Sequence, residues 1–233
     1  QQGISIYGRL DGKGLLDFNY WVSAFMGTGR GARENDDDHL MWMTRWQWNF
    51  TGSPLVFEGS DTRYHEKFRG ILALAAVTNQ SPYTRFSTSG GGQLEGFEEG
   101  VAGQYRVNQW MQESAFMIKG VSFQQELHWK QINDHVNNTQ TTMMGNLTQI
   151  GYFVHHAWSA FPKNVELYLR HAVYKPDIHL VSDNDHEFSL GGNWFIRGHR
   201  NKLTAEVSYF LYNFDTDVLQ NGTRYRFQWD VSF

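Results

Sequence analysis

The sequence predicts an all-β fold, a transmembrane antiparallel up-and-down β-barrel, and three observations carry this prediction. Apolar and polar residues alternate over most of the 233-residue chain with the period of two that a β-strand imposes. Nine Trp, eleven Tyr and seventeen Phe are spread along the chain instead of gathering in core runs. Short and long polar connections alternate along the chain between these segments, as in membrane barrels.

The composition excludes several classes of protein. The chain has 40% hydrophobic residues and a mean hydropathy of -0.54, and no stretch approaches the ~18 consecutive apolar residues of a membrane-spanning helix. A barrel stays possible because its wall alternates lipid-facing and lumen-facing residues. With no cysteine, the chain has no disulfide and no Cys-based metal site, and a net charge of -4 disfavours a nucleic-acid partner.

The last predicted strand, residues 222–233, shows the alternation most clearly. One face carries Tyr225, Phe227, Trp229, Val231 and Phe233. The other face carries Arg224, Arg226, Gln228, Asp230 and Ser232. We expect the aromatic face to contact lipid and the charged face to line a wet lumen, the reverse of a soluble barrel. Aromatic girdles are expected at the membrane surfaces, with Tyr152, Trp158, Trp194, Tyr209 and Trp229 as members.

The same pattern recurs in other segments and predicts about 11–12 strands, beginning near Gly3. The clearest further segments are residues 40–49, 121–130, 165–170, 187–197 and 202–213. Short connections are expected at residues 11–14, 119–120, 161–164 and 198–201, and long ones at residues 28–38, 81–100, 134–146, 176–186 and 215–221. The connection at residues 51–68 is anomalously long for the short side. This order places the end of the chain in the periplasm.

The strand count comes out odd, at eleven, whereas bacterial single-chain barrels have even counts. We therefore expect residues 1–233 to be a single domain that does not close a barrel by itself. At least one strand is expected before Gly3, because an unpaired edge in lipid leaves backbone groups unbonded. No signal peptide precedes Gln1, so we expect the chain to start after processing or to lack its beginning. Direct pairing of residues 4–9 with residues 223–233 would contradict this expectation.

Several motifs resemble the phosphate-selective porin O/P family of outer-membrane proteins. The strongest runs from Gly191 to Leu203 and reads GGNWFIRGHRNKL, and a second lies in residues 109–126. Further matches are residues 149–153 with Leu169 and Arg170, and the opening Ile4–Arg9 segment, which looks like a mid-barrel strand. The resemblance implies a 16-stranded homotrimeric porin in the bacterial outer membrane, of which this chain is the C-terminal part. It also implies lipid and lipopolysaccharide as surroundings. The family's constriction loop has no counterpart here.

Charged residues in the inner phase of their strands are the candidate site. The candidate anion path comprises Arg9, Arg45, Lys130, Arg170, Arg224 and Arg226. The carboxylates in the same phase are Glu113, Glu126, Glu166, Glu206 and Asp230. Guanidinium groups can bind phosphate in a bidentate manner, but they can equally pair with the facing carboxylates. Because a strong anion filter is built from rings of Arg and Lys, this balanced lumen predicts modest selectivity.

The sequence favours passive diffusion of small hydrophilic solutes, anionic or neutral, with a weak preference for anions by resemblance. The alternative is a structural or interaction barrel with a blocked lumen. The acidic runs at residues 36–39 and 183–186 could hold Ca²⁺, but a solvated loop is favoured because the ligand spacing of a calcium loop is absent. An omptin-like rim protease would use Asp36 with Asp38 and Asp177 with His179, pairs that acidic loops also produce by chance. We expect no enzyme, cofactor or metal site.

Overall fold

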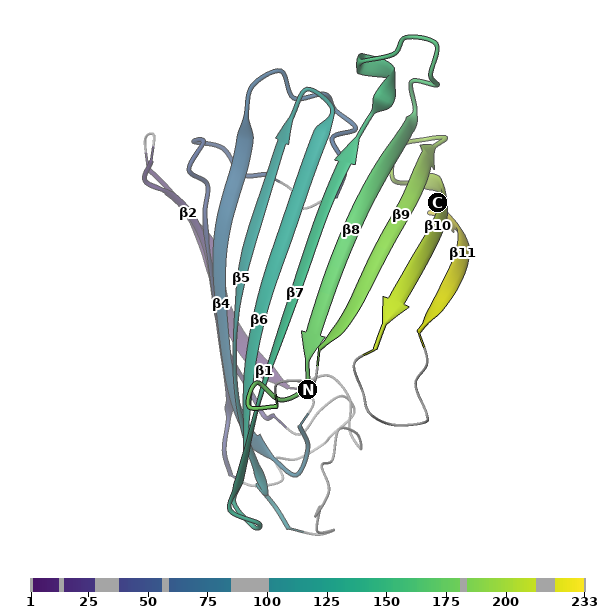
Figure 1. The fold of residues 1–233 in the computed structure, drawn as a ribbon. Coiled ribbons are helices and arrows are strands. Elements are labelled where there is room, and N and C mark those ends of the chain that lie inside the picture. Colours follow the sequence, from purple (N-terminus) through teal and green to yellow (C-terminus); the bar gives the residue numbers. More distant parts are fainter. Residues whose placement is uncertain are drawn as a thin grey trace.

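The computed structural model describes residues 2–12, 15–27, 38–55, 59–84, 101–180, 184–212 and 221–232, and in them the chain forms one antiparallel sheet. Its eleven strands lie in sequence order, so that every strand pairs with its neighbours along the chain (Figure 1). The prediction of an all-β, up-and-down architecture with about eleven strands is confirmed.

The strands lengthen toward the middle of the sheet. They are β1 (Gly3–Asp11), β2 (Asp17–Phe25), β3 (Met41–Trp48), β4 (Arg69–Ser81), β5 (Tyr105–Ile118), β6 (Val121–Asp134), β7 (Thr139–Tyr152), β8 (Val165–Lys175), β9 (Asp185–Phe195), β10 (Asn201–Leu211) and β11 (Gly222–Val231). One short 3₁₀ helix, η1 (Val154–His156), lies between β7 and β8. Among the described residues, no helix combines the length and the apolar character needed to cross a membrane.

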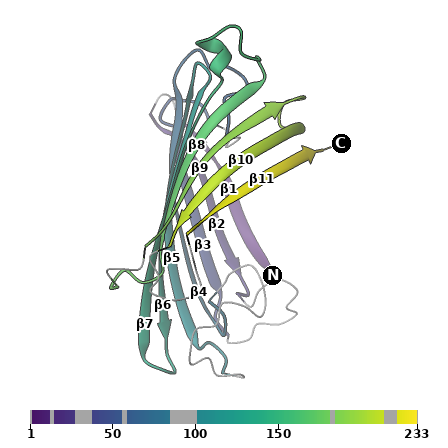
Figure 2. The ribbon, with the colours of Figure 1, turned by 45° about the vertical axis from the view of Figure 1, so that its right-hand side comes forward.

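The sheet is curved but open. In the described part of the chain, β1 pairs only with β2, and β11 pairs only with β10 (Figures 1 and 2). The expectation that β1 and β11 do not pair with each other is confirmed. The backbone groups on the outer edges of both strands are therefore available to other strands.

The connections fall at two ends of the sheet. We call the end that carries residues 12–16, 49–68, 119–120, 153–164 and 196–200 the short-connection end, and the opposite end the long-connection end. The predicted long connection at residues 134–146 is wrong, because β6 and β7 continue to a tight turn at residues 135–138. Asp134 stabilises this turn by accepting bonds from the amides of Val136 and Asn137. The start of β7 is polar and rich in Thr, so it shows no apolar alternation in the sequence, although its backbone pairs fully with β6.

Four further predicted connections differ or lie largely outside the described residues. The connection predicted at residues 161–164 is longer, because residues 153–164 include η1. The long connections predicted at residues 28–38, 81–100 and 215–221 fall largely outside the described residues.

The strand register separates two faces of the sheet. On β11, the side chains of Phe227, Tyr225 and Trp229 are 68–85% exposed on one face. Arg226 lies on the other face, opposite Glu206 of β10, and the two side chains bond at 2.7 Å. The predicted division of β11 into an aromatic and a charged face is confirmed for its described residues, and Phe233 lies outside them. That the aromatic face contacts lipid stays a prediction.

The polar face is the concave, inner face. Arg45 of β3 bonds Glu113 of β5, and Arg170 of β8 lies 2.7 Å from Glu206 of β10. Each of these pairs reaches over an intervening strand, although strands two apart are separated by about 9.5 Å. Side chains converge in this way on the inside of a curved sheet, so the exposed apolar face is the outer one.

A row of aromatic rings follows the short-connection end on the outer face. Consecutive ring centroids lie 4.6–6.3 Å apart. The row contains Phe18, Trp48, Phe50, Phe68, Phe116 and Phe123. Of the predicted girdle residues, Tyr152, Trp158, Trp194 and Trp229 lie at this same end, and Tyr209 lies toward the long-connection end. That these residues contact a membrane surface stays a prediction.

The inner face is not wet throughout, contrary to expectation. Two buried apolar clusters lie on it, one at each end of the central strands. The first contains Leu55, Ile71, Ala115 and Met117, at the short-connection end. The second contains Tyr105, Val107 and Ile132, with Met143 packed against it, at the long-connection end. Alternation alone could not reveal them, because inner-phase apolar residues look like irregularities in the pattern.

The turn between β5 and β6 gives a testable consequence. Lys119 and Gly120 have φ values of 48° and 82°, as a two-residue turn of primed type requires. A Cβ on Gly120 would lie 2.5 Å from the His156 ring. We expect Gly120→Ala to lower the free energy of unfolding by about 1–3 kcal/mol. Lys119→Asn should leave it unchanged or raise it slightly, because Asn tolerates this conformation. Urea unfolding of both variants measures the contrast, and equal effects would contradict it.

Candidate functional site

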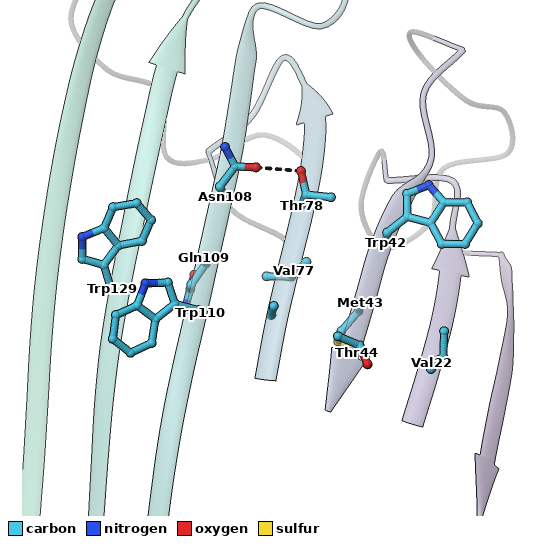
Figure 3. Close-up of a pocket in the computed structure, with 11 residues that line it drawn as sticks. Val22, Trp42, Met43, Thr44, Val77, Thr78, Asn108, Gln109, Trp110 and Trp129 are labelled. Atoms are coloured by element: carbon cyan, nitrogen blue, oxygen red, sulfur yellow. Dashed lines mark hydrogen bonds between the residues drawn. The ribbon is translucent and has the colours of Figure 1, made fainter. Parts of the chain in front are cut away.

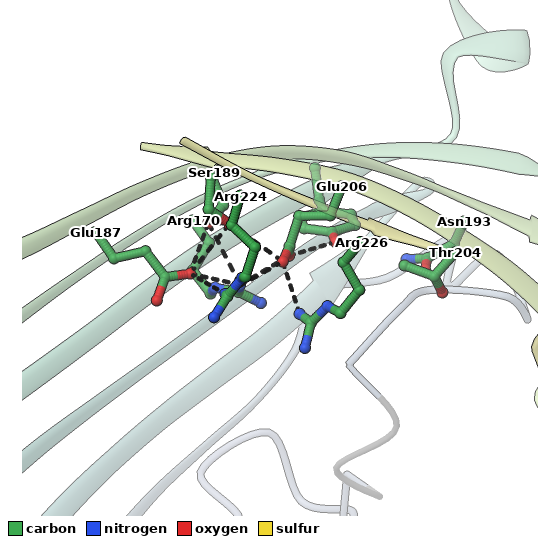
Figure 4. Close-up of polar contacts among 10 residues, drawn as sticks. Arg170, Glu187, Ser189, Asn193, Thr204, Glu206, Arg224 and Arg226 are labelled. Carbon is green, nitrogen blue, oxygen red and sulfur yellow. Dashed lines mark hydrogen bonds and ion pairs between the residues drawn. The ribbon is translucent and has the colours of Figure 1, made fainter. Parts of the chain in front are cut away.

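A group of ion-paired side chains on the inner face joins four neighbouring strands, β8 to β11. We call it the inner network, and it consists of Arg170, Glu187, Glu206, Arg224 and Arg226 (Figure 4). All five side chains occupy the inner phase of their strands. The predicted candidates Arg170, Glu206, Arg224 and Arg226 are thus brought together by the fold.

Glu206 is the centre of the inner network. Its side chain is 0% exposed, and it accepts a 2.7 Å bond from the Tyr168 hydroxyl. The Nη2 atoms of Arg170 and Arg226 each lie 2.7 Å from its carboxylate oxygens. A buried carboxylate is tolerated only when opposite charge and hydrogen bonds replace its water. Glu206 therefore holds β8, β10 and β11 at a fixed spacing.

Glu187 is the second carboxylate of the inner network, and the sequence analysis did not select it. It accepts 2.8 Å bonds from Arg170 and from the Ser189 hydroxyl, and Arg224 lies 3.4 Å away. Its position in the inner phase of β9 was the available signal. The network combines three guanidinium groups with two carboxylates, so the ionised group carries one surplus positive charge.

Two ion pairs in the first half of the sheet are linked by the side chains of Asn49 and Gln47. Arg9 donates to Asp17 through Nε at 2.9 Å and through Nη2 at 2.6 Å, a bidentate pair. Arg45 donates from Nε to Glu113 at 3.0 Å, and its guanidinium lies 5.0 Å from the centre of the Trp21 ring. Asp17 was missed by the sequence analysis because it begins its strand, where the alternating phase is hard to assign.

The remaining predicted residues have local partners. The Lys130 Nζ donates to the carbonyl of Thr84 at 2.6 Å. Glu126 accepts a 2.8 Å bond from Gln124 and lies 3.2 Å from the His128 ring nitrogen. Asp230 lies 3.7 Å from the Lys202 amine. The predicted cations thus fall into several groups on different strands, and the geometry is that of arginines paired with carboxylates.

Glu166 lies on the inner face as predicted, but it does not face open solvent. It is 0% exposed and accepts bonds from Ser60 at 2.6 Å, Asn193 at 2.9 Å and Ser122 at 3.1 Å. Ser60 belongs to the long connection between β3 and β4, which therefore reaches β8. The sequence analysis missed Ser60 because its partner is 106 residues away and no local pattern marks the contact.

A shallow groove of about 390 Å³ lies on the outer face, away from these charges (Figure 3). Trp110 and Trp129 flank it on one side and Trp42 on the other. Its floor contains the Thr78 hydroxyl, which donates to Asn108 at 2.7 Å. Because this groove is open to the outer face, it is not a path along the inner face.

The acidic and His-containing loops lie partly within the described residues. No cluster of three or more His, Asp or Glu side chains there could hold a metal ion. The Asp177 carboxylate accepts a bond from the amide of His179, which is a local turn contact. The predicted residues Asp36, Asp37 and Asp183 lie outside the described residues.

A comparison with models of known protein families and with curated proteins finds no match to this chain. The sheet, its two faces and the inner network are therefore the features from which a function can be inferred.

Two adjacent glycines of β9 test the packing beneath the inner network. A Cβ on Gly191 would lie 2.3 Å from the Tyr168 ring, whereas on Gly192 its nearest neighbour would lie at 3.4 Å. We expect Gly191→Ala to displace Tyr168 from Glu206 and to lower the free energy of unfolding by about 1–3 kcal/mol. Gly192→Ala on the outer face is the matched control and should change it by less than about 1 kcal/mol. Urea titrations measure the free energy of unfolding of both variants. Equal decreases would show that Gly191 does not provide the space for Tyr168.

Proposed function

We propose that this chain forms part of the wall of a bacterial outer-membrane porin for passive diffusion of small hydrophilic solutes. The observation that carries the proposal is the division of one sheet into an exposed apolar outer face and a charged inner face. A soluble sheet buries its apolar face, whereas a membrane barrel turns that face toward lipid. The inner face then borders an aqueous path.

The outer face of the sheet has the features expected of a surface that contacts the outer membrane. Exposed Leu74, Leu169 and Leu190 lie on the outer face between the two ends, where an apolar band is needed. The aromatic row at the short-connection end supports a girdle at one membrane surface. Membrane lipid and lipopolysaccharide are the expected surroundings.

The open edges of β1 and β11 support a larger barrel. In lipid, each backbone group left unbonded costs several kcal/mol, so strands beyond those in this sheet must cover both edges. The resemblance to phosphate-selective porins suggests a 16-stranded wall completed by strands of the same protein. Closure by another chain would satisfy the same constraint.

Polar pairs on the outer face support assembly into a homotrimer. Gln112 donates to Ser114 at 2.6 Å, and Thr148 donates to Asn146 at 3.1 Å. These residues share the outer phase with Leu72, Leu74 and Leu127 in mid-sheet. Amides and hydroxyls are unfavourable against acyl chains even when paired. A subunit contact over β5–β7 would remove them from lipid.

A weak preference for anions, phosphate among them, is the finer part of the proposal. The single surplus positive charge of the inner network supports it, together with the half-exposed guanidinium groups of Arg224 and Arg226. Pairing of each arginine with a carboxylate argues for modest selectivity.

The blocked-lumen barrel stays the second candidate, and a specific observation favours it. The connection between β3 and β4 lies against the inner face and buries Glu166. Single-channel recording of the purified protein in planar bilayers separates the two. Steady conductance steps support the porin, and their complete absence supports the blocked barrel.

Arg45 provides a test of selectivity. Arg45→Gln leaves the Glu113 carboxylate without its cation, so we expect the reversal potential in a salt gradient to shift toward cation preference. The double variant Arg45→Gln with Glu113→Gln removes both charges and should return close to the original value. A reversal potential that does not move in the single variant would show that the pair lies off the ion path.

Neighbouring residues on β11 test which face contacts lipid. Phe227→Arg places a charge on the outer face. It should lower the free energy of unfolding of the vesicle-embedded protein by about 2–4 kcal/mol. Gln228→Arg places the same charge on the inner face and should change it little. Urea titration of vesicle-embedded protein gives both values. Equal penalties would contradict the assignment of faces.

A further inference from the structure

The connection between β3 and β4 is the exception among the turns of the short-connection end. It spans residues 49–68, whereas the β5–β6 turn at the same end needs only Lys119 and Gly120. We call its residues 59–68 the inner segment. Polar contacts and ring contacts tie this segment to strands and turns that lie well beyond its own neighbours.

Ser60 fixes the inner segment to the far side of the sheet. Its hydroxyl donates to Glu166 of β8 at 2.6 Å, and Ser122 of β6 and Asn193 of β9 complete the bonds to the same carboxylate. Because Ser60 is only nine residues from the start of β4, the segment must cross the inner ends of β5, β6 and β7 to reach Glu166. Glu166 lies in the inner phase, so this crossing runs inside the curve of the sheet.

Asp61 fixes the inner segment to the β5–β6 turn. Its carboxylate accepts a 2.9 Å bond from the amide of Gly120 and 3.1 Å bonds from the amide of His65. The His65 carbonyl in turn accepts a 2.7 Å bond from the amide of Lys119. The Asp61 side chain is fully buried, so loss of these bonds would leave a buried charge without donors.

Apolar contacts cover the same region. Leu55, which precedes the inner segment, packs with Ile71, Ala115 and Met117 in a buried cluster on the inner face. The Tyr64 ring lies 4.2 Å from the His156 ring of η1. Polar bonds and packing therefore both hold the inner segment against the inner face of the sheet at the short-connection end.

We propose that the inner segment is a fixed constriction of the pore at the short-connection end of the sheet. It sets the size limit for solutes at that opening. This inference rests on the proposed porin function. The segment occupies space inside the curve from β4 to β8, and any solute that follows the inner face must pass beside it. Its anchors are buried and fully bonded, so it narrows this opening permanently and does not act as a gate.

Asp61→Asn tests the constriction, because an amide in that place loses the charge that holds the amides of Gly120 and His65. Glu66→Gln is the matched control: it removes one negative charge from an exposed position of the same segment without touching an anchor. We expect Asp61→Asn to raise single-channel conductance roughly twofold, since conductance follows the narrowest cross-section. It should also admit larger neutral sugars in liposome-swelling assays, and Glu66→Gln should not.

Accessibility of position 60 gives a second readout that needs no conductance. The chain has no native cysteine, so a Ser60→Cys variant carries a single thiol. Ser60 is buried, and we expect slow labelling by a maleimide in the folded protein and fast labelling once Asp61→Asn is added. If Asp61→Asn does not fold, Ser60→Ala, which loses only the bond to Glu166, replaces it in the conductance and sugar assays, and unchanged values there overturn the constriction.

The outcomes separate the two proposals. If the unmodified protein conducts and the anchor variant conducts more and admits larger sugars, both proposals stand. If the unmodified protein is silent and the anchor variant conducts, the porin function fails and the segment is confirmed as the obstruction. The constriction is overturned if thiol labelling shows that the segment has moved while conductance and sugar cut-off stay unchanged. It is also overturned if position 60 labels rapidly in the folded Ser60→Cys variant without Asp61→Asn.

Discussion

The backbone register of the sheet is the constraint on which the rest of the structure depends. Side chains alternate between the two faces of a strand, so one register carried through ten antiparallel pairings assigns every side chain to the inner or the outer face. Arg45 lies opposite Trp21 of β2 and Ala75 of β4, all in the inner phase. A slip of one residue anywhere would turn guanidinium groups outward and leucines inward. The ion pairs between strands stabilise the register because they form in only one alignment.

The charged residues of the inner face bond to one another across strands and so stabilise the sheet. Glu206 joins β8, β10 and β11, and the Arg45–Glu113 pair joins β3 to β5. Small residues make these long reaches possible. Gly191 leaves room for Tyr168 to lie over β9 and reach Glu206, and Ala73 and Ala75 leave room beneath Arg45. If the proposed lumen exists, charge engaged in this way is less available to ions in it, and a wall rich in arginine need not be a strong anion filter.

Local pattern predicted most of the sheet but not its inner architecture. The eleven strands, the faces of β11 and the inner phase of the charged candidates follow from alternation, because each depends on neighbours two residues apart. The start of β7 was missed, since Thr139–Thr142 offers no apolar face and is held by backbone bonds to β6. Ser60 and Asp61 were missed for a different reason. Their partners Glu166 and Gly120 lie 106 and 59 residues away, and no property of the segment itself marks those contacts.

The unevenness of charge along the inner face bears on how the wall is completed. Arg9 pairs with Asp17 and Asp11, and Arg45 pairs with Glu113, whereas the surplus positive charge lies at β11, the open edge of the sheet. Arg224 and Arg226 are 47% and 42% exposed because no strand lies beyond β11 in the described part of the chain. Under the proposed closure, the strand that pairs with β11 brings its own inner-phase side chains beside these two guanidinium groups. Carboxylates there would neutralise the surplus, and neutral or basic residues would preserve it. The sign of the pore at this point is therefore decided jointly by β11 and by the strand that covers it.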